Sequence, residues 1–170
     1  MNKKRHLSTV SLYRDDMKFS SGHFTIFSAT ERERLHGHNF RVESEITAEI
    51  KEVGITYDYS LTRKEILVLC RSLNEYLLLP QYSPYLNIEE DHQYYYAFFN
   101  GVKMSFLKED TLILPIKNVT SEGLAGWFVD RLTNDKALLK EREIVKLKIK
   151  ISTTPGQDAS ASWEEEMIDA

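Results

Sequence analysis

The chain has 170 residues and a mass of 19.8 kDa, and its 42% apolar and 28% charged residues are ordinary for one globular domain. Its 22 basic and 26 acidic side chains give a net charge of −4, with no basic stripe that could bind a nucleic-acid backbone. Because there is one cysteine, no apolar run long enough to span a membrane and no apolar stretch after the basic N-terminus, we expect a single cytoplasmic domain over residues 1–170 that binds neither nucleic acid nor membranes.

The most regular pattern of the sequence lies between His36 and Ile50. Even positions carry His36, His38 and then mainly apolar side chains, whereas nearly all odd positions are polar. This alternation predicts a half-buried strand with one face packed and one face in water. Met17–Phe27 is expected to pair with it as a hairpin across the polar loop Ser28–Arg34.

A helical period follows the turn at Gly54. Thr62 to Glu65 has the spacing of a capping box. Apolar side chains then recur at helical intervals, at Ile66, Leu69, Cys70, Leu73, Tyr76 and Leu77. The sequence therefore predicts one helix that continues to Leu77 and ends before Pro80, with Cys70 as a core residue rather than a nucleophile.

The second half of the chain alternates strand and helix patterns again. Tyr94–Phe99 and Val102–Leu107 flank Asn100-Gly101, which is typical of a hairpin with a type I′ turn. Thr120-Ser121-Glu122 predicts the start of a second amphipathic helix, and the alternation of Val145–Ile151 predicts a last strand. This order predicts an α+β fold, with an antiparallel sheet and helices packed on one face.

Three of the five histidines, His23, His36 and His38, lie within sixteen residues of one another. The strand pattern puts His36 and His38 on the apolar face, where their ring nitrogens need partners. A metal ion would satisfy both, and His23 on the neighbouring strand could supply a third ligand. Three histidines with an open fourth position are typical of catalytic zinc. The alternative is a set of core histidines with backbone partners, which the pairing on one face disfavours.

A second metal motif fits less well. His36-x-His38 followed by Glu43 resembles the H-x-H-x(3,4)-E motif of cupins. Glu43 belongs to the opposite face of the strand, and Ile50 occupies a position where that motif has a glycine.

Several motifs resemble the 6-pyruvoyl tetrahydropterin synthase / 6-carboxytetrahydropterin synthase family. Phe19–His23 and Leu35–Phe40 carry its paired histidine motifs, Gly54–Tyr59 is similar to its G-x-x-x-D-F strand end, and Thr120–Glu122 is similar to its P-T-x-E helix start. The resemblance covers residues 17–163. The long insert from Tyr82 to Val119 and the sequence before His36 are most similar to the type III branch, in which glutamate replaces cysteine.

This resemblance implies a tunnelling fold (T-fold), a four-stranded antiparallel sheet with two helices on one face, whose subunits close a barrel on oligomerisation, usually as a hexamer. It implies Zn²⁺ bound by His23, His36 and His38, and a 7,8-dihydroneopterin triphosphate-like substrate held between subunits. Residues Thr120, Ser121 and Glu122 would contact that substrate. The insert, about residues 82–119, would carry the extra hairpin.

The same comparison implies the catalytic groups and shows where this sequence departs from the family. Glu33 matches the type III glutamate that acts as acid and base, and partial enclosure should raise its pKa. The family's L-D-H relay reads Leu73-Asn74-Glu75, so that Glu75 would stand in for the relay histidine. Thr153 occupies the position of the glutamate that anchors the pterin, a role that Glu122 or Asp158 could take over.

Three functions therefore remain open. The first is a zinc-dependent lyase or synthase that acts on a 7,8-dihydroneopterin triphosphate-like substrate. The second is an altered paralogue that binds zinc and a pterin-like or other ligand without the standard reaction. The third is an assembly protein that keeps the metal only for stability. The three histidines favour the first two, Glu33 favours the enzyme, and Asn74 and Thr153 favour the paralogue.

Overall fold

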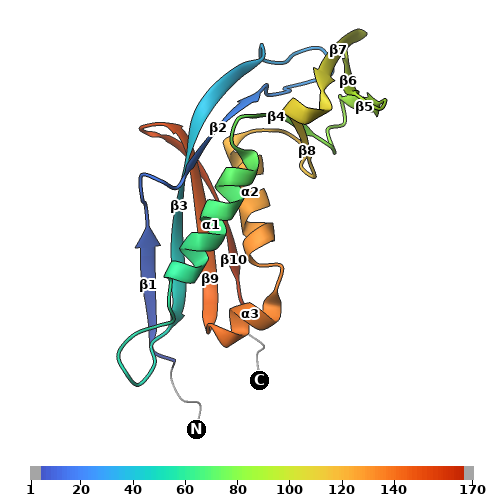
Figure 1. The fold of residues 1–170 in the computed structure, drawn as a ribbon. Helices are drawn as coiled ribbons and strands as arrows, with labels where there is room; N and C mark the ends of the chain where they lie inside the picture. Colours follow the sequence, from blue (N-terminus) through green and yellow to red (C-terminus); the bar gives the residue numbers. More distant parts are fainter. Residues whose placement is uncertain (1–4, 167–170) are drawn as a thin grey trace.

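The computed structural model describes residues 5–166, which form a seven-stranded sheet, a separate three-stranded sheet and three α-helices (Figure 1). The large sheet has the order β10-β9-β3-β2-β4-β8, and β1 also pairs with β3. Its strands are β1 (Leu7–Leu12), β2 (Lys18–His23), β3 (His36–Glu49), β4 (Tyr76–Pro80), β8 (Thr111–Leu114), β9 (Ile144–Thr154) and β10 (Gln157–Glu164).

Strand β3 is the centre of this sheet. Its first half pairs with β2 and its second half with β1, both antiparallel, while β9 pairs along its other edge. Burial alternates along β3 as the sequence predicted, with Phe40, Val42 and Ile46 almost fully buried between exposed neighbours. The predicted hairpin of β2 and β3 is confirmed.

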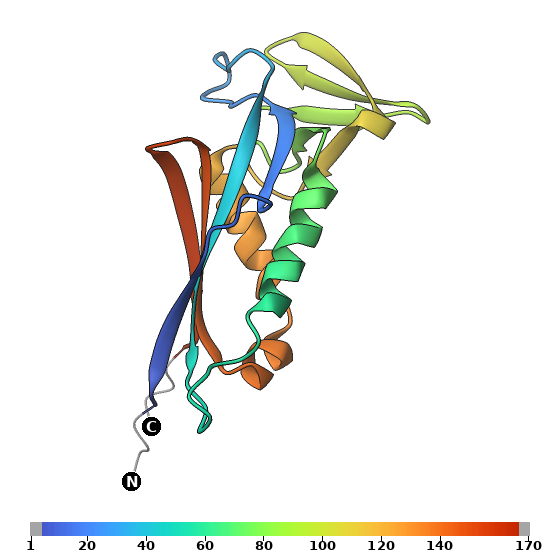
Figure 2. The ribbon, with the colours of Figure 1, turned by 60° about the vertical axis from the view of Figure 1, so that its left-hand side comes forward.

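Helices α1 (Ser60–Leu73) and α2 (Ser121–Leu132) pack on one face of the sheet, as Figure 2 shows, and the short α3 (Lys136–Glu141) follows α2. The main core lies between these layers, where Phe19 and Phe40 of the sheet stack on each other and Phe19 also stacks on Phe128 of α2. The α+β class and the placement of both helices on one face are confirmed.

The limits predicted for the first helix are wrong at both ends. The helix begins at Ser60, and Thr62 does not cap it, because the Thr62 hydroxyl is buried against the hydroxyl of Tyr57 at 2.8 Å. The helix ends at Leu73, since Glu75 has a positive φ of 67° and donates its backbone N–H to the carbonyl of Ser20. Tyr76 then starts β4, whose backbone pairs with β2 instead of continuing the helix.

The prediction of a four-stranded antiparallel sheet is incomplete, because the sheet also contains β4, which the sequence pattern assigned to the helix. β2, β3, β9 and β10 do form an antiparallel set, but β4 pairs with β2, and β8 with β4, in parallel. The parallel pairs join segments that are far apart in the sequence, so no local sequence pattern predicts them.

The insert, residues 82–119, carries a three-stranded sheet of β5 (Asn87–Glu90), β6 (Tyr94–Phe99) and β7 (Val102–Leu107), and it also contains β8. The predicted hairpin of β6 and β7 is confirmed, and the positive φ values of Asn100 (46°) and Gly101 (75°) suit its two-residue turn. A second apolar cluster joins the small sheet to the segment after β2, through Phe24, Ile26, Ala97 and Phe99 among others.

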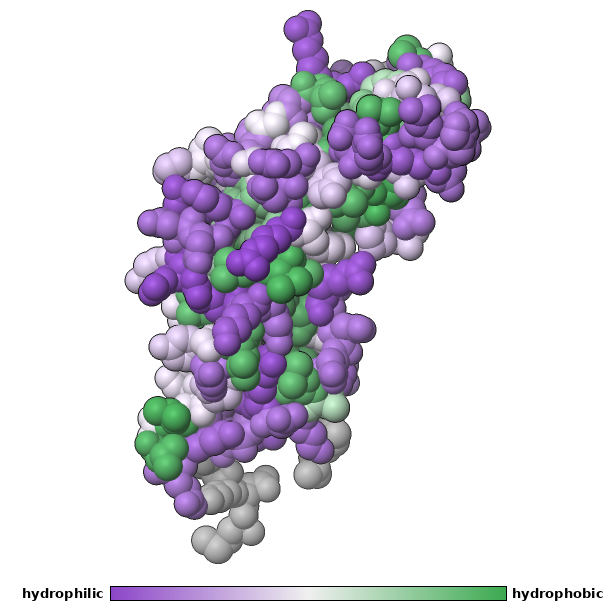
Figure 3. Space-filling model, in the orientation of Figure 1, coloured by the Kyte–Doolittle hydropathy of each residue, from purple (hydrophilic) through white to green (hydrophobic). Residues whose placement is uncertain are grey.

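Hydrophilic side chains cover most of the face seen in Figure 3, and an apolar patch at its lower left covers the loop after β3, where Val53 and Ile55 are exposed. Within residues 5–166, the helices lack the combination of length and apolar character that crossing a membrane requires.

Two glycines of α2 provide a matched test of how this helix begins. A Cβ atom at Gly123 would lie 2.4 Å from the carbonyl oxygen of Asn118, whereas a Cβ at Gly126 would meet no atom within 4 Å. We expect Gly123→Ala to lower the free energy of unfolding by about 1–3 kcal/mol, because the backbone before the helix must shift. Gly126→Ala should raise it by up to ~1 kcal/mol through helix propensity alone. Urea unfolding followed by circular dichroism measures both, and equal effects of the two substitutions would contradict this packing.

Candidate functional site

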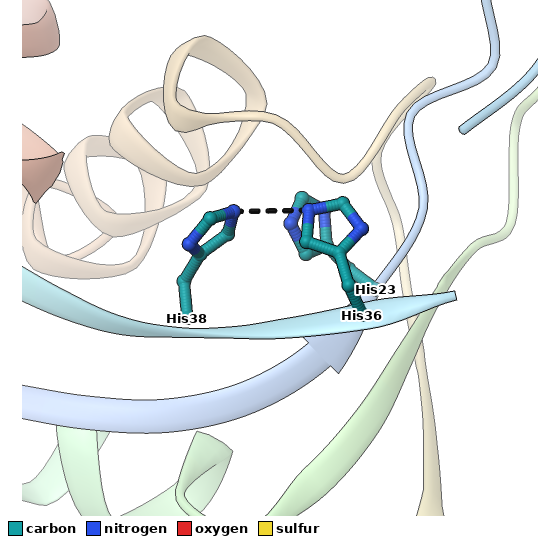
Figure 4. Close-up of side chains that lie close together, drawn as sticks. All are labelled: His23, His36 and His38. Atoms are coloured by element: carbon teal, nitrogen blue, oxygen red, sulfur yellow. Dashed lines mark hydrogen bonds between the residues drawn. The ribbon is translucent and has the colours of Figure 1, made fainter. Parts of the chain in front are cut away.

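Three histidines converge at the end of the β2–β3 ladder. His23, the last residue of β2, is directly opposite His36, the first residue of β3. His38 lies two residues further along β3 and therefore on the same face. One ring nitrogen from each of the three lies within 4.8 Å of the other two, and Figure 4 shows the rings turned toward one another.

Backbone carbonyls orient two of these rings from behind. Nδ1 of His23 lies 2.7 Å from the carbonyl oxygen of Val119, and Nδ1 of His36 lies 2.8 Å from that of Arg34. A carbonyl can only accept, so each Nδ1 carries the proton and each Nε2 presents a lone pair. Metal-binding histidines show this arrangement, in which a hydrogen bond to the second nitrogen fixes the ring.

The three Nε2 atoms are the ring nitrogens that remain to bind a metal. Nε2 of His23 is buried and has no hydrogen-bond partner among the described residues. Nε2 of His36 and Nε2 of His38 lie 3.0 Å apart (Figure 4). A cation between the three nitrogens would give the buried Nε2 of His23 a partner and would replace the hydrogen bond between His36 and His38 with two metal–nitrogen bonds. The donor set therefore fits a metal ion.

Burial also favours the neutral imidazoles that metal binding needs. The pKa of His23 is lowered chiefly by burial, with further lowering from His36 and His38, although the Val119 carbonyl opposes this. The pKa of His38 is lowered by burial and by the neighbouring His36. A lower pKa means that less free energy is needed to displace a proton when a metal binds.

Glu33 is the carboxylate beside this cluster. Its Oε2 lies 4.0 Å from Nε2 of His36 and accepts a hydrogen bond of 2.9 Å from the backbone N–H of Thr25. Burial raises its pKa, but the hydrogen bond from Thr25 and the nearby histidines outweigh this, so that the pKa is lowered. The expected rise in pKa is therefore wrong. Arg32 does not pair with the carboxylate; it donates to the backbone carbonyl of Glu33 at 2.7 Å.

The start of α2 lies close to the histidines through Val119. Thr120 is the N-cap of the helix, and its hydroxyl accepts the N–H of Gly123 at 3.2 Å. Ser121 and Glu122 form the first turn, and Glu122 is exposed. Thr120 thus has a structural role at the helix start, one residue after the carbonyl that holds His23.

Thr153 lies near the end of β9. The register pairs Ile151 with Val42, and the alternation of the strand puts Thr153 on the same face as Ile151. That face of the sheet also carries Phe40 and His38.

Glu75 lies away from the other predicted catalytic residue. It borders a pocket of about 510 Å³ that also includes Ser20 and Asn39, residues on the opposite face of the ladder from the histidines. Of the predicted metal ligands, only His38 reaches this pocket, and Glu33 does not. Asn74 uses its Oδ1 to accept the backbone N–H of Ser20, so it fixes the end of α1.

Several groups that shape the site carried no signal in the sequence. Asn118 pairs its side-chain amide with both backbone groups of Ile26, at 3.1 Å and 2.8 Å, and so joins the β2–β3 loop (residues 24–35) to the start of α2. The carbonyls of Val119 and Arg34 and the N–H of Thr25 are backbone groups that every residue type offers, so residue identity could not reveal them. Asn118 is the exception, because an asparagine just before a predicted helix start is a residue type that often binds nearby backbone groups.

The chain is similar to curated proteins and to solved structures whose names refer to tetrahydropterin synthases. Two curated relatives are named "Putative 6-carboxy-5,6,7,8-tetrahydropterin synthase". One, from Methanocaldococcus jannaschii, is 25% identical over 84% of this chain and 88% of its own length, and the other, from Pyrococcus horikoshii, is 25% identical over 86% of each. Among solved structures, 6-pyruvoyl tetrahydropterin synthase of Plasmodium falciparum superposes with a TM-score of 0.87 and 27% identity over 93% of this chain and 98% of its own.

The Plasmodium vivax enzyme, in a variant that replaces a catalytic glutamate with alanine, superposes equally well. Its TM-score is 0.87 at 26% identity over 94% of this chain and 99% of its own. The family model described as 6-pyruvoyl tetrahydropterin synthase matches residues 12–164, nearly all of the described chain. The chain therefore belongs to the 6-pyruvoyl tetrahydropterin synthase family.

Proposed function

We propose that this protein is a zinc-dependent pterin synthase of the lyase type, which acts on a 7,8-dihydroneopterin triphosphate-like substrate. His23, His36 and His38 bind Zn²⁺, and Glu33 acts as acid and base. One observation carries the proposal: three imidazole Nε2 atoms lie close together, one of them is buried with no partner in residues 5–166, and a carboxylate lies beside them. Membership of the family supports a pterin as the class of substrate.

Zinc suits this donor set because it accepts three imidazoles and leaves a fourth position for substrate. Bound there, it would supply a Lewis acid that polarises the oxygens of the substrate side chain. The chain's own groups hold the ligands in place: the Val119 and Arg34 carbonyls keep the rings of His23 and His36 from rotating.

Glu33 is suited to take a proton from the substrate side-chain carbon. Thr25 binds Oε2 and leaves Oε1 free of hydrogen bonds among the described residues. Its lowered pKa keeps the carboxylate in the ionised form that accepts a proton, and it also makes the carboxylate a weaker base than one whose pKa is close to neutral. The glutamate described as catalytic in the P. vivax enzyme supports this role and the assignment to the type III branch.

We further propose that the protein is a homo-oligomer, a hexamer of T-fold subunits that close a barrel. β8 and β10 are the outer strands of the large sheet, and open edges favour pairing with another copy. Because Glu75 lies away from Glu33 within one chain, an oligomer is also the setting in which it would reach the site of another subunit.

An altered paralogue that binds a pterin-like ligand without the standard reaction is the second candidate. Asn74 cannot ionise and is engaged with the backbone of Ser20, so it offers no proton relay. Thr153 offers a hydroxyl where the family resemblance implies a carboxylate, which would bind the pterin N–H groups more strongly.

The metal site is tested by metal analysis of purified protein. We expect about one zinc per chain in the wild type and less than a tenth of that in His36→Ala/His38→Ala, because too few ligands remain. His92→Ala is the matched control, since His92 lies in the turn before β6, far along the chain from the site, and it should keep its full zinc content. Full zinc in the double variant would rule out this ligand set.

The role of Glu33 is tested with Glu33→Gln, which keeps the shape of the side chain but cannot accept a proton in the same way. Turnover of 7,8-dihydroneopterin triphosphate, followed by mass spectrometry, should fall by about 10²–10⁴-fold. Zinc content should be unchanged, because Glu33 is not a ligand in this account. A variant that turns over at the wild-type rate would show that another group carries the proton.

The position of the pterin anchor is tested with Thr153→Glu. If β9 lacks only the anchoring carboxylate, this variant should bind sepiapterin more tightly by about 1.5–3 kcal/mol, the range for a hydrogen bond to a charged group. Thr154→Glu, at the exposed neighbouring position, is the control and should change little. Tight wild-type binding that Thr153→Glu does not improve would mean that another acid, such as Glu122 or Asp158, anchors the pterin.

A further inference from the structure

The β2–β3 loop, residues 24–35, carries Glu33 on a compact chain reversal. Ile26 and Arg32 form an antiparallel bridge, and the N–H groups of Phe27 and Ser28 both donate to the carbonyl of Glu31. This reversal has its own backbone hydrogen bonds, so it can hold a defined shape. What fixes it relative to the rest of the molecule must come from its side chains.

Glu33 is bound to Thr25 at two points across this reversal. The backbone N–H of Glu33 donates to the carbonyl of Thr25 at 2.8 Å, and the N–H of Thr25 donates to Oε2 of Glu33 at 2.9 Å. The direction of the carboxylate therefore depends on the relative position of residues 25 and 33. Any movement of the loop that breaks this double contact frees the carboxylate from its place beside His36.

Arg32 lies directly next to this contact. Its guanidinium is 4.9 Å from the ring centroid of Phe24 and 5.7 Å from that of Phe99, and it donates to the backbone carbonyl of Glu33 at 2.7 Å. Phe24 and Phe99 are at least 94% buried and Arg32 is half-buried, so these cation–π contacts are better shielded from water than contacts at the surface. Phe24 belongs to the loop, whereas Phe99 is the last residue of β6 in the insert.

The β2–β3 loop thus packs against the insert. Phe24 and Ile26 do not belong to the main core; they pack in the second apolar cluster with Ala97 and Phe99 of β6 and with Leu79 of β4. Figure 2 shows the small sheet beside the β2–β3 loop at one end of the molecule. A pocket of about 680 Å³ lies between the loop and the hairpin, and Glu33, Phe99 and Val102 are among the residues that line it.

We propose that Arg32 is a positioning residue for Glu33, and that the insert holds the carboxylate in place through the contact of Phe99 with Arg32. This inference rests on the proposed function only in giving Glu33 a catalytic task; the mechanical link itself does not depend on it. Arg32 donates a hydrogen bond to the backbone carbonyl of Glu33, and Thr25 donates one to its side chain. The cation–π contact with Phe99 holds Arg32 against the β6–β7 hairpin. Binding of Arg32 to substrate is the competing role, because Arg32 also lines the pocket.

The link is tested first without any substrate. Amide hydrogen exchange of Thr25, followed by NMR, reports directly on its bond to Glu33. We expect Arg32→Met and Phe99→Leu each to speed this exchange by about tenfold, as the loss of a cation–π contact shielded from water implies. Lys103→Met is the matched control, because the cation–π contacts of Lys103, with Tyr96 at 3.7 Å and Phe98 at 5.9 Å, both lie within the hairpin. Its Thr25 exchange should match the wild type.

Turnover then separates positioning from substrate binding. With 7,8-dihydroneopterin triphosphate as the probe, Arg32→Met should lower kcat by about tenfold with KM nearly unchanged, and Arg32→Lys should restore part of the loss. In a Glu33→Gln background, Arg32→Met should cause no further loss, because its effect passes through Glu33. A rise in KM alone, or a loss that persists in that background, would overturn the proposal in favour of direct substrate contact.

The proposed function and the positioning role of Arg32 would be contradicted by different results. If the wild type does not turn over this substrate at all, the proposed function fails, and Thr25 exchange still decides whether Arg32 and Phe99 hold Glu33. Unchanged exchange in both folded variants would overturn the positioning role whatever the activity. Should Arg32→Met not fold, Arg32→Lys and Phe99→Leu give the same readout, since each weakens one side of the same contact.

Discussion

The pairing of β2 with β3 determines where the three imidazoles of the site lie. Its register puts His23 opposite His36, and the two-residue repeat of a strand puts His38 on the same face. A slip of one residue would move His36 and His38 to the other face and separate them from His23. The same ladder ends at the β2–β3 loop, so the chain reversal that carries Glu33 begins where the three imidazoles meet.

The ladder alone does not complete the site, because its orientation depends on two distant segments. The carbonyl of Val119, at the start of α2, holds His23, and Asn118 binds the backbone of Ile26. The insert holds the loop from the other side through Phe99 and Arg32. The candidate metal centre therefore lies where the sheet, the start of α2 and the insert meet. The start of α2 and the insert provide contacts that the residues of β2 and β3 cannot make by themselves.

Local periodicity was sufficient to predict β3, the hairpin of β6 and β7 and the gathering of His23, His36 and His38, because neighbouring residues determine each of these features. It failed where long-range contacts decide. Tyr76 and Leu77 fit a helical repeat, yet pairing with β2 turns them into a strand. The pKa of Glu33 was predicted with the wrong sign, since the opposing hydrogen bond comes from the backbone of Thr25, which no sequence motif marks.

The central claim is that three imidazoles of one chain form the ligand set of a zinc ion with an open position. X-ray absorption at the zinc edge of the purified, zinc-loaded protein tests it most directly, because it reports the type and number of ligands. We expect three imidazole nitrogens at about 2.0–2.1 Å and one further light atom in the zinc shell. A shell that contains sulfur, or fewer than three imidazoles, would contradict it.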